Sequence, residues 1–197
     1  SISGQFKDQQ NITEEYIILY IGRIHKRKGV DFLIRAYEVL LRTWEGKDIV
    51  LVIGGPDDNY RPSLERLVEQ LGLIGKVKFA GFIPSIASAY RDADVLVYPS
   101  TYEIFGLVPF EALLCGTPVI VSDDCGCGEI IKEAGCGQLI KYGDVAGLAE
   151  ALKIALENPE INKQMVSAGR QYIEENLTWE NMAKRMEKLY ENCIHNY

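Results

Sequence analysis

Short apolar runs alternate with amphipathic segments along most of this sequence. The run "YIILYIG" (16–22) is followed by apolar residues at helical spacing from Val30 to Trp44, and then by the run "DIVLVIGG" (48–55). This order indicates a strand, a helix and a second strand. The pattern therefore predicts a fold built from repeated β-α units.

The same alternation continues to about residue 141. Further strands are expected at 76–81, 94–100, 118–122 and 137–141, with helices near 61–72, 85–92, 106–115 and 128–134. The strands are rich in β-branched residues and apolar on both faces, which indicates burial on both sides. We therefore expect an α/β fold, a Rossmann-like doubly wound parallel sheet of about six strands with helices on both faces.

The part of the chain after Asp144 is expected to be helical. One helix follows directly, a second begins at Pro159-Glu160, and a third begins with a capping box at Thr178 in which Asn181 replaces the preferred acid. Residues 1–15 are expected to be a polar lead-in, and residues 16–197 a single domain. Because the chain begins with Ser1 and a polar stretch, we expect it to be a piece of a longer protein.

Charge and hydropathy narrow the classes of partner. The formal net charge is −7, and no run of Lys and Arg exceeds "HKRKG" (25–29), so nucleic acid is not expected as a partner. No apolar run approaches the roughly 20 residues of a membrane span, and the first residues lack the layout of a signal peptide. A cytoplasmic location is therefore expected.

The five cysteines are an odd number at irregular spacings, which favours reduced thiols over a disulfide framework. The segment "DCGCG" (124–128) offers two thiols, Cys125 and Cys127. A Cys-x-Cys pair lacks the spacing of structural zinc sites. We expect small thiols that fill a tight turn, and no metal.

In an open parallel sheet, ligands bind beyond the carboxyl ends of the strands, where helix N-termini present free N–H groups. The loop "GRIHKRKG" carries Arg23 and Lys28 directly after the first strand, and Gly106 stands at an expected helix start. Two cations and a backbone without a Cβ suit a diphosphate. The alternative is a solvated basic turn. For His25, inside the same loop, the alternatives are contact with the anion and contact with solvent, and we expect it to face solvent.

Two carboxylates, Glu103 and Glu111, flank the glycine of "YEIFGLVPFEALL" (102–114). They are eight positions apart and therefore need not face each other, which favours two separate hydroxyl-binding groups over a joint acid/base pair. The alternatives are a helix-start acid for Glu103 and a solvated helix face for Glu111. Glu111 has apolar neighbours in the sequence, however, a setting in which an idle charge is costly.

Three stretches resemble, in order, the carboxyl-terminal half of retaining GT-B glycosyltransferases of group 1, family four. They are "GRIHKRKGVDFLIRAYEVL" (22–40), "VKFAGFIPSIASAYRDADVLVYPSTYEIFGLVPFEALLCGTPVIVSDDCGCGEII" (77–131) and "CGQLIKYGDVAGLAEALKIAL" (136–156). The Glu-x7-Glu spacing with an internal Phe-Gly, downstream of the Arg/Lys loop, is the most specific of these features. The resemblance covers nearly the whole chain from Tyr16.

The resemblance implies that this domain holds a nucleoside diphosphate sugar as donor substrate, with no further cofactor. Arg23 and Lys28 would bind the diphosphate, Glu111 the ribose and Glu103 the sugar, with Arg23, Lys28 and Glu103 as the catalytic groups. Further substrate contacts would come from two backbone segments: Phe82, Ile83 and Pro84 beside the base, and Phe105, Gly106 and Leu107 beside the sugar and phosphate.

The implied reaction is transfer of a glycosyl unit to an acceptor with retention at the anomeric carbon, without a metal. The acceptor-binding domain would precede Ser1, so the fragment alone is expected to be inactive. Any peripheral membrane contact would come through that missing half. The last segment, "LTWENMAKRMEKLYENCI" (177–194), resembles the helix that packs back towards the amino-terminal domain.

Three other functions remain open. A nucleotide-sugar epimerase shares the architecture and would take its acid/base residues from the other half. A sugar-nucleotide sensor would bind the donor without catalysis. A flavodoxin-like receiver or another nucleotide-binding domain would use the same sheet, but predicts no preference for sugar nucleotides over free nucleotides.

Overall fold

The fold is that of a computed structural model, which describes residues 4–101 and 103–195. Six parallel strands form one sheet in the order β3-β2-β1-β4-β5-β6. The strands are β1 (Tyr16–Ile21), β2 (Ile49–Gly54), β3 (Val77–Gly81), β4 (Val95–Tyr98), β5 (Val119–Ser122) and β6 (Gln138–Ile140). The sequence prediction of a doubly wound parallel sheet is confirmed.

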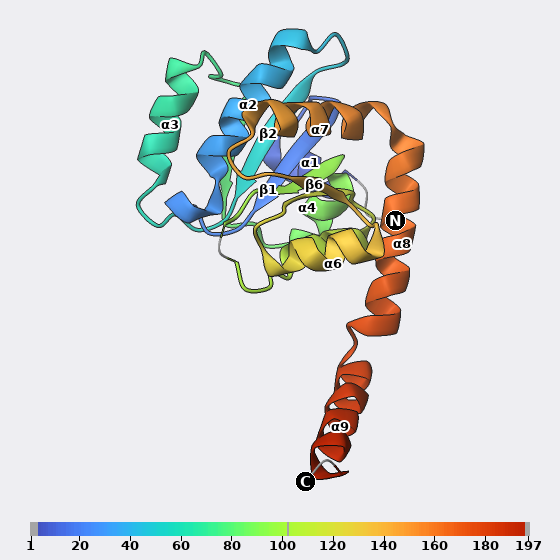
Figure 1. The fold of residues 1–197 in the computed structure, drawn as a ribbon. Coiled ribbons are helices and arrows are strands. Elements are labelled where there is room, and N and C mark those ends of the chain that lie inside the picture. The colour runs from blue at the N-terminus through green and yellow to red at the C-terminus, as the bar shows by residue number, and fades with distance from the viewer. Residues whose placement is uncertain (1–3, 102, 196–197) are drawn as a thin grey trace.

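Helices cover both faces of the sheet (Figure 1). The first face is covered by α2 (Val30–Thr43), α3 (Arg61–Gln70) and α7 (Val145–Glu157). The other is covered by α1 (Gln5–Gln10), α4 (Ile86–Asp92), α5 (Val108–Cys115), α6 (Gly126–Ala134) and α8 (Pro159–Asn176). Successive strand residues alternate between the two cores.

The inner strands are buried on both faces, as the apolar runs predicted. Strands β1, β2, β4 and β5 are almost wholly buried, whereas the edge strands β3 and β6 are largely half-buried. An edge strand has a neighbour on one side only, which explains the difference. Because the chain runs outward from β1 to β3 and then outward from β4 to β6, the loops after β1 and β4 diverge and leave a crevice between them.

The segment expected as a polar lead-in contributes to the core. Phe6 is fully buried, and the carboxylate of Asp92 accepts hydrogen bonds from the backbone N–H groups of Gly4 (2.6 Å), Phe6 (2.8 Å) and Lys7 (3.2 Å). Residues 4–10 are therefore part of the folded domain, not a linker. The sequence pattern missed this helix because its anchoring carboxylate lies on α4, far along the chain. Residues 1–3 lie outside the described residues.

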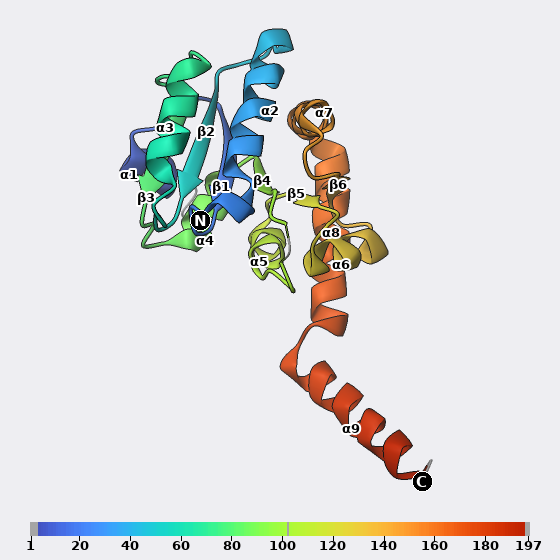
Figure 2. The same cartoon turned by 60° about the vertical axis from the view of Figure 1, so that its left-hand side comes forward.

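The last helix, α9 (Trp179–His195), extends away from the rest of the domain in both views (Figures 1 and 2). The expected cap is confirmed, because Oγ1 of Thr178 accepts a 3.3 Å hydrogen bond from the N–H of Asn181. Several large apolar side chains of α9 are exposed: Trp179, Met182, Met186, Leu189, Tyr190 and Ile194. Within residues 4–101 and 103–195, no helix is both long enough and apolar enough to cross a bilayer.

Candidate functional site

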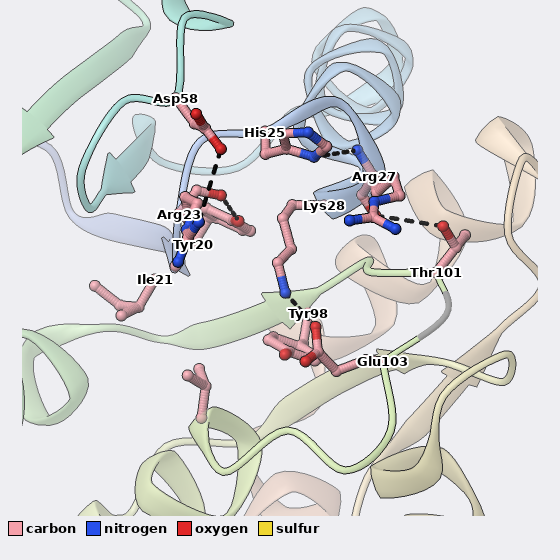
Figure 3. A pocket seen from close by; sticks show the side chains of 12 residues that line it. Tyr20, Ile21, Arg23, His25, Arg27, Lys28, Asp58, Tyr98, Thr101 and Glu103 are labelled. Atoms are coloured by element: carbon pink, nitrogen blue, oxygen red, sulfur yellow. Dashed lines mark hydrogen bonds and ion pairs between the residues drawn. The ribbon is translucent and has the colours of Figure 1, made fainter.

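A cavity of about 450 Å³ opens at the carboxyl ends of β1 and β4, where the two loops diverge (Figure 3). It is formed mainly by the β1–α2 and β4–α5 loops, with one residue from the β2–α3 loop. Its lining residues are Tyr20, Ile21, Gly22, Arg23, His25, Arg27, Lys28, Asp58, Tyr98, Thr101, Glu103 and Val108.

The cavity brings together the three side chains predicted to be catalytic. Arg23 follows β1 directly, and Lys28 ends a 3-10 turn (Lys26–Lys28) that precedes α2. The Lys28 ammonium forms an ion pair with the Glu103 carboxylate, and both side chains are about three-quarters buried. Residues 75 positions apart thus meet at one point, as the shared edge of a parallel sheet predicts.

Arg23 has a carboxylate neighbour that the sequence analysis did not single out. Its Nη1 lies 3.8 Å from Oδ2 of Asp58, in the β2–α3 loop. This pair is more open to solvent, since the Arg23 side chain is 67% exposed. Its Coulomb attraction is therefore screened, and Arg23 keeps the freedom to turn towards an anion.

Two buried tyrosines, Tyr20 and Tyr98, form the floor of the cavity, and both lie inside segments that the sequence predicted to be buried strands. The Tyr20 hydroxyl donates a 2.9 Å hydrogen bond to the carbonyl oxygen of Arg23, which fixes the start of the cationic loop. Burial, followed by the charge of Glu103, raises the pKa of Tyr98. Burial also raises the pKa of Tyr20, so both phenols stay neutral. A tyrosine inside a strand has the same sequence pattern as a core residue, so only its position at the strand end reveals its role.

His25 lines the cavity and is half-buried. Its Nδ1 accepts a 3.2 Å hydrogen bond from the N–H of Arg27, so the ring caps the turn that carries Lys28. The residue belongs to the support of the cationic loop. Arg27 and Thr101 also line the cavity, and the carbonyl oxygen of Arg27 accepts a 3.1 Å hydrogen bond from the N–H of Thr101.

Glu111 does not line this cavity. It lies in the first turn of α5, where its sequence neighbours Phe110 and Ala112 point into the core while its own side chain is exposed. The expected apolar setting is therefore absent, because the helix turns those neighbours away. The hydroxyl of Tyr90 donates a 2.9 Å hydrogen bond to Oε2 of Glu111 and holds the carboxylate in one place.

The Phe105-Gly106-Leu107 segment leads into α5, as predicted, but its side chains do not line the cavity. The Phe105 ring stacks on Phe110 with centroids 5.4 Å apart. Gly106 has a φ of 82°, and a Cβ there would lie 3.0 Å from the Tyr98 ring. Any other residue would be strained and crowded, so the glycine lets this loop lie against Tyr98.

A second, smaller cavity of about 230 Å³ adjoins the first. The two share Ile21, Gly22 and Arg23, and the smaller one is lined mainly by apolar and glycine residues of the loops after β2 and β3. Of the three residues predicted to lie beside a base, Phe82 and Ile83 line it and Pro84 does not. An apolar slot therefore lies next to a cation-lined cavity.

The two cysteines of "DCGCG" lie side by side at the start of α6, buried as the turn prediction required. All five cysteines are free thiols. Within the part of the chain that the structure describes, no group of three or more His, Cys, Asp or Glu side chains is arranged to hold a metal ion.

The family profile described as "Glycosyl transferases group 1" matches residues 3–172, which is most of the chain. The chain belongs to the group 1 glycosyltransferases. Among curated members of related sequence, the uncharacterized glycosyltransferase MJ1607 of Methanocaldococcus jannaschii is 36% identical over 179 residues. The match covers 90% of this chain and 45% of that protein, so this chain spans about half the length of such a relative.

Solved structures place this glycosyltransferase chain in the GT-B architecture. The C-terminal domain of the group 1 protein LpcC from Francisella tularensis matches with a TM-score of 0.77 and 28% identity, over 89% of this chain and 92% of that one. Anabaena Alr3699/HepE, solved with UDP and with UDP-glucose, matches with TM-scores of 0.84 and 0.83 and 21% and 22% identity. Both matches cover 96% of this chain and 52% of HepE. The chain corresponds to the carboxyl-terminal domain of a GT-B glycosyltransferase.

Proposed function

We propose that this domain binds a nucleoside diphosphate sugar and that, in a longer protein, it serves as the donor half of a retaining glycosyltransferase. The observation that carries the proposal is the joined pair of cavities. An apolar slot suits a flat base, and the adjoining cations suit a diphosphate. HepE has the same fold and was solved in complex with UDP-glucose, which supports this class of ligand.

In this proposal, each group of residues in the site binds one part of the donor. The base lies in the smaller cavity against Phe82 and Ile83, with the backbone at Pro84 beside it. The diphosphate lies between Arg23 and Lys28, and the sugar hydroxyls contact Glu103.

The ribose contacts the exposed carboxylate of Glu111, which Tyr90 orients. The backbone of Phe105, Gly106 and Leu107 approaches the sugar and phosphate at the N-terminus of α5.

Catalysis in this proposal is mainly charge stabilisation. As the glycosidic C–O bond breaks, positive charge develops on the sugar ring and negative charge collects on the departing diphosphate. Arg23, Lys28 and the N-terminus of α5 surround that negative charge, and Glu103 faces the positive centre. Removing one such preorganised group costs about 3 kcal/mol, roughly a hundredfold in rate. No nucleophile has to come from this chain.

Turnover requires a second domain in this proposal, because this domain is assigned the donor and the acceptor is assigned to an amino-terminal domain. The exposed apolar face of α9 is where we place contact with that amino-terminal domain. Orienting two substrates together accounts for about 7 to 11 kcal/mol of barrier lowering. The isolated domain therefore binds the donor without transferring its sugar.

The experiment is a thermal-shift screen of nucleotide sugars, nucleoside diphosphates and free sugars against this chain, because a ligand that binds the folded state raises its melting temperature. The best donor is then assayed for transfer with this chain and with the longer protein. We expect a shift with one or more nucleotide sugars and transfer only by the longer protein. No shift with any nucleotide sugar contradicts donor binding, and transfer by this chain alone contradicts the need for a second domain.

A further inference from the structure

Cys125 and Cys127 stand directly behind the loop that carries Glu103, and neither has a part in the proposed glycosyl transfer. Their Sγ atoms are 3.2 Å apart. Cys125 donates its thiol proton to the carbonyl oxygen of Ser122 at 2.9 Å, which leaves Cys127 to donate to Cys125. We propose that these two thiols are a redox modification site, and that they close to a reversible disulfide that displaces Glu103.

The two thiols differ in the way that an attacking and a resolving cysteine differ. Cys125 precedes α6 and keeps 7% of its surface in solvent, whereas Cys127 is fully buried one residue into the helix. The hydrogen bond from Cys127 lowers the pKa of Cys125, and a helix N-terminus favours the same thiolate. Cys125 is therefore the nucleophile, and Cys127 is held beside it as the second thiol.

The oxidant is a peroxide, which is small enough to reach a thiol with little exposed surface. The Cys125 thiolate attacks one peroxide oxygen, an S–O bond forms, the O–O bond breaks and hydroxide leaves. The Cys127 sulfur then attacks the sulfenic sulfur, an S–S bond forms, and the hydroxyl leaves as water with the Cys127 proton. Each sulfur loses one electron in total to the peroxide oxygens. A dithiol reopens the bond by thiol–disulfide exchange.

Backbone contacts connect this pair to Glu103. The N–H of Gly126, between the two cysteines, donates a 3.0 Å hydrogen bond to the carbonyl oxygen of Glu103. A Cβ on Gly126 would lie 1.9 Å from the carbonyl oxygen of Ile104, so the two backbones touch without free space. A disulfide brings the sulfurs about 1 Å closer than they are. Closing the bond therefore shifts Gly126 and, through it, the loop at Glu103.

The disulfide is tested by mass spectrometry after peroxide treatment, in a Cys115→Ser/Cys193→Ser background that removes the two more exposed thiols. We expect a linked Cys125–Cys127 peptide that dithiothreitol reverses. Cys136 is the internal control and should stay reduced, because burial raises its pKa to about 11. It is then alkylated once the protein is unfolded. Cys127→Ser should instead accumulate sulfenic acid on Cys125, trapped by dimedone. Two thiols that remain alkylatable, or equal oxidation of Cys136, overturn the proposal.

The effect on the loop is tested by NMR and by affinity. The amide signals of Gly126 and Ile104 should shift on oxidation in the parent protein and stay in place in Cys127→Ala. The affinity for UDP-glucose, a readout that rests on the proposed function, should fall about tenfold, the loss expected for one hydrogen bond to a charged group. Unmoved amide signals, or equal affinity in both redox states, overturn the coupling. If neither state binds UDP-glucose, donor binding fails, while the thiol and amide results still decide the disulfide.

Discussion

The hydroxyl of Tyr90 donates a 2.9 Å hydrogen bond to Oε2 of Glu111, and so joins the buried side of α4 to the exposed first turn of α5. Burial and, next, the charge of Glu111 raise the pKa of Tyr90, so the phenol stays a neutral donor. Tyr90 is therefore a positioning residue for a carboxylate that would otherwise move freely in solvent.

Tyr90→Phe removes this hydrogen bond and leaves Glu111 without its orienting partner. We expect the affinity for UDP, measured by calorimetry, to fall about three- to tenfold, and the free energy of unfolding to fall by about 1 kcal/mol. Tyr37→Phe is the matched control, because the buried Tyr37 hydroxyl donates a 2.7 Å bond to the carbonyl oxygen of Ile49 on the other face of the sheet. Equal losses of affinity in the two variants would show that the Tyr90 effect is only structural.

The two predicted phosphate ligands should differ in strength. Lys28→Ala should weaken UDP binding by about tenfold or more, and Arg23→Ala by less, because the Arg23 side chain is 67% exposed against 26% for Lys28. Lys26→Ala is the control, since Lys26 is exposed in the same turn but does not line the cavity. Calorimetry at low and moderate salt measures the difference. If Lys26→Ala has the same effect as Lys28→Ala, the cations act as a diffuse field and not as ligands.

The two glutamates should separate by the part of the donor that they contact. Glu111→Gln should weaken UDP and UDP-glucose about equally, because both carry the ribose. Glu103→Gln should weaken UDP-glucose, and should leave UDP unchanged or bound more tightly, because it also frees Lys28 from its ion pair. Parallel titrations with the two ligands measure the ratio of affinities. The same ratio in both variants would rule out this division of roles.

The positions of the strands along the chain and the place of the site could be predicted from the sequence, because both depend on local patterns. Apolar runs of strand length mark the sheet, and the edge of a parallel sheet then groups Arg23, Lys28 and Glu103. The remaining features depend on contacts between distant residues. Asp92 anchors the backbone of Gly4 and Phe6 across 86 positions or more, and no pattern within either segment indicates that contact.

Exposure of single side chains was the least predictable property. Glu111 has apolar neighbours, yet α5 turns it outward, because Phe110 and Ala112 take the core positions. His25 lies among charged residues, yet its hydrogen bond to the N–H of Arg27 fixes it at the cavity wall. In each case a hydrogen bond or a helical rotation decided the orientation, and composition did not.

Asp94 should give the stability of the domain a pH dependence separate from the site. Burial raises its pKa above 3.8, although the N–H of Ile17 donates a 2.7 Å bond to the carboxylate. The folded state thus favours the protonated form, so Asp94 contributes stability that is present below about pH 3.8 and lost as the pH rises through the higher folded pKa. As the pH rises from 3 to 7, the free energy of unfolding of Asp94→Asn, measured with urea, should increase relative to that of the parent protein. If the difference in free energy between the two proteins does not change with pH, the raised pKa is contradicted.

The most direct test of donor binding is a crystal structure of this chain with UDP-glucose. We expect the diphosphate between Arg23 and Lys28, the uracil in the slot of Phe82 and Ile83, and the glucose hydroxyls at Glu103. In that structure Glu103 accepts bonds from the sugar, and Lys28 turns from Glu103 to the phosphates. A nucleotide bound away from the two joined cavities, or a diphosphate that contacts neither Arg23 nor Lys28, would contradict the account.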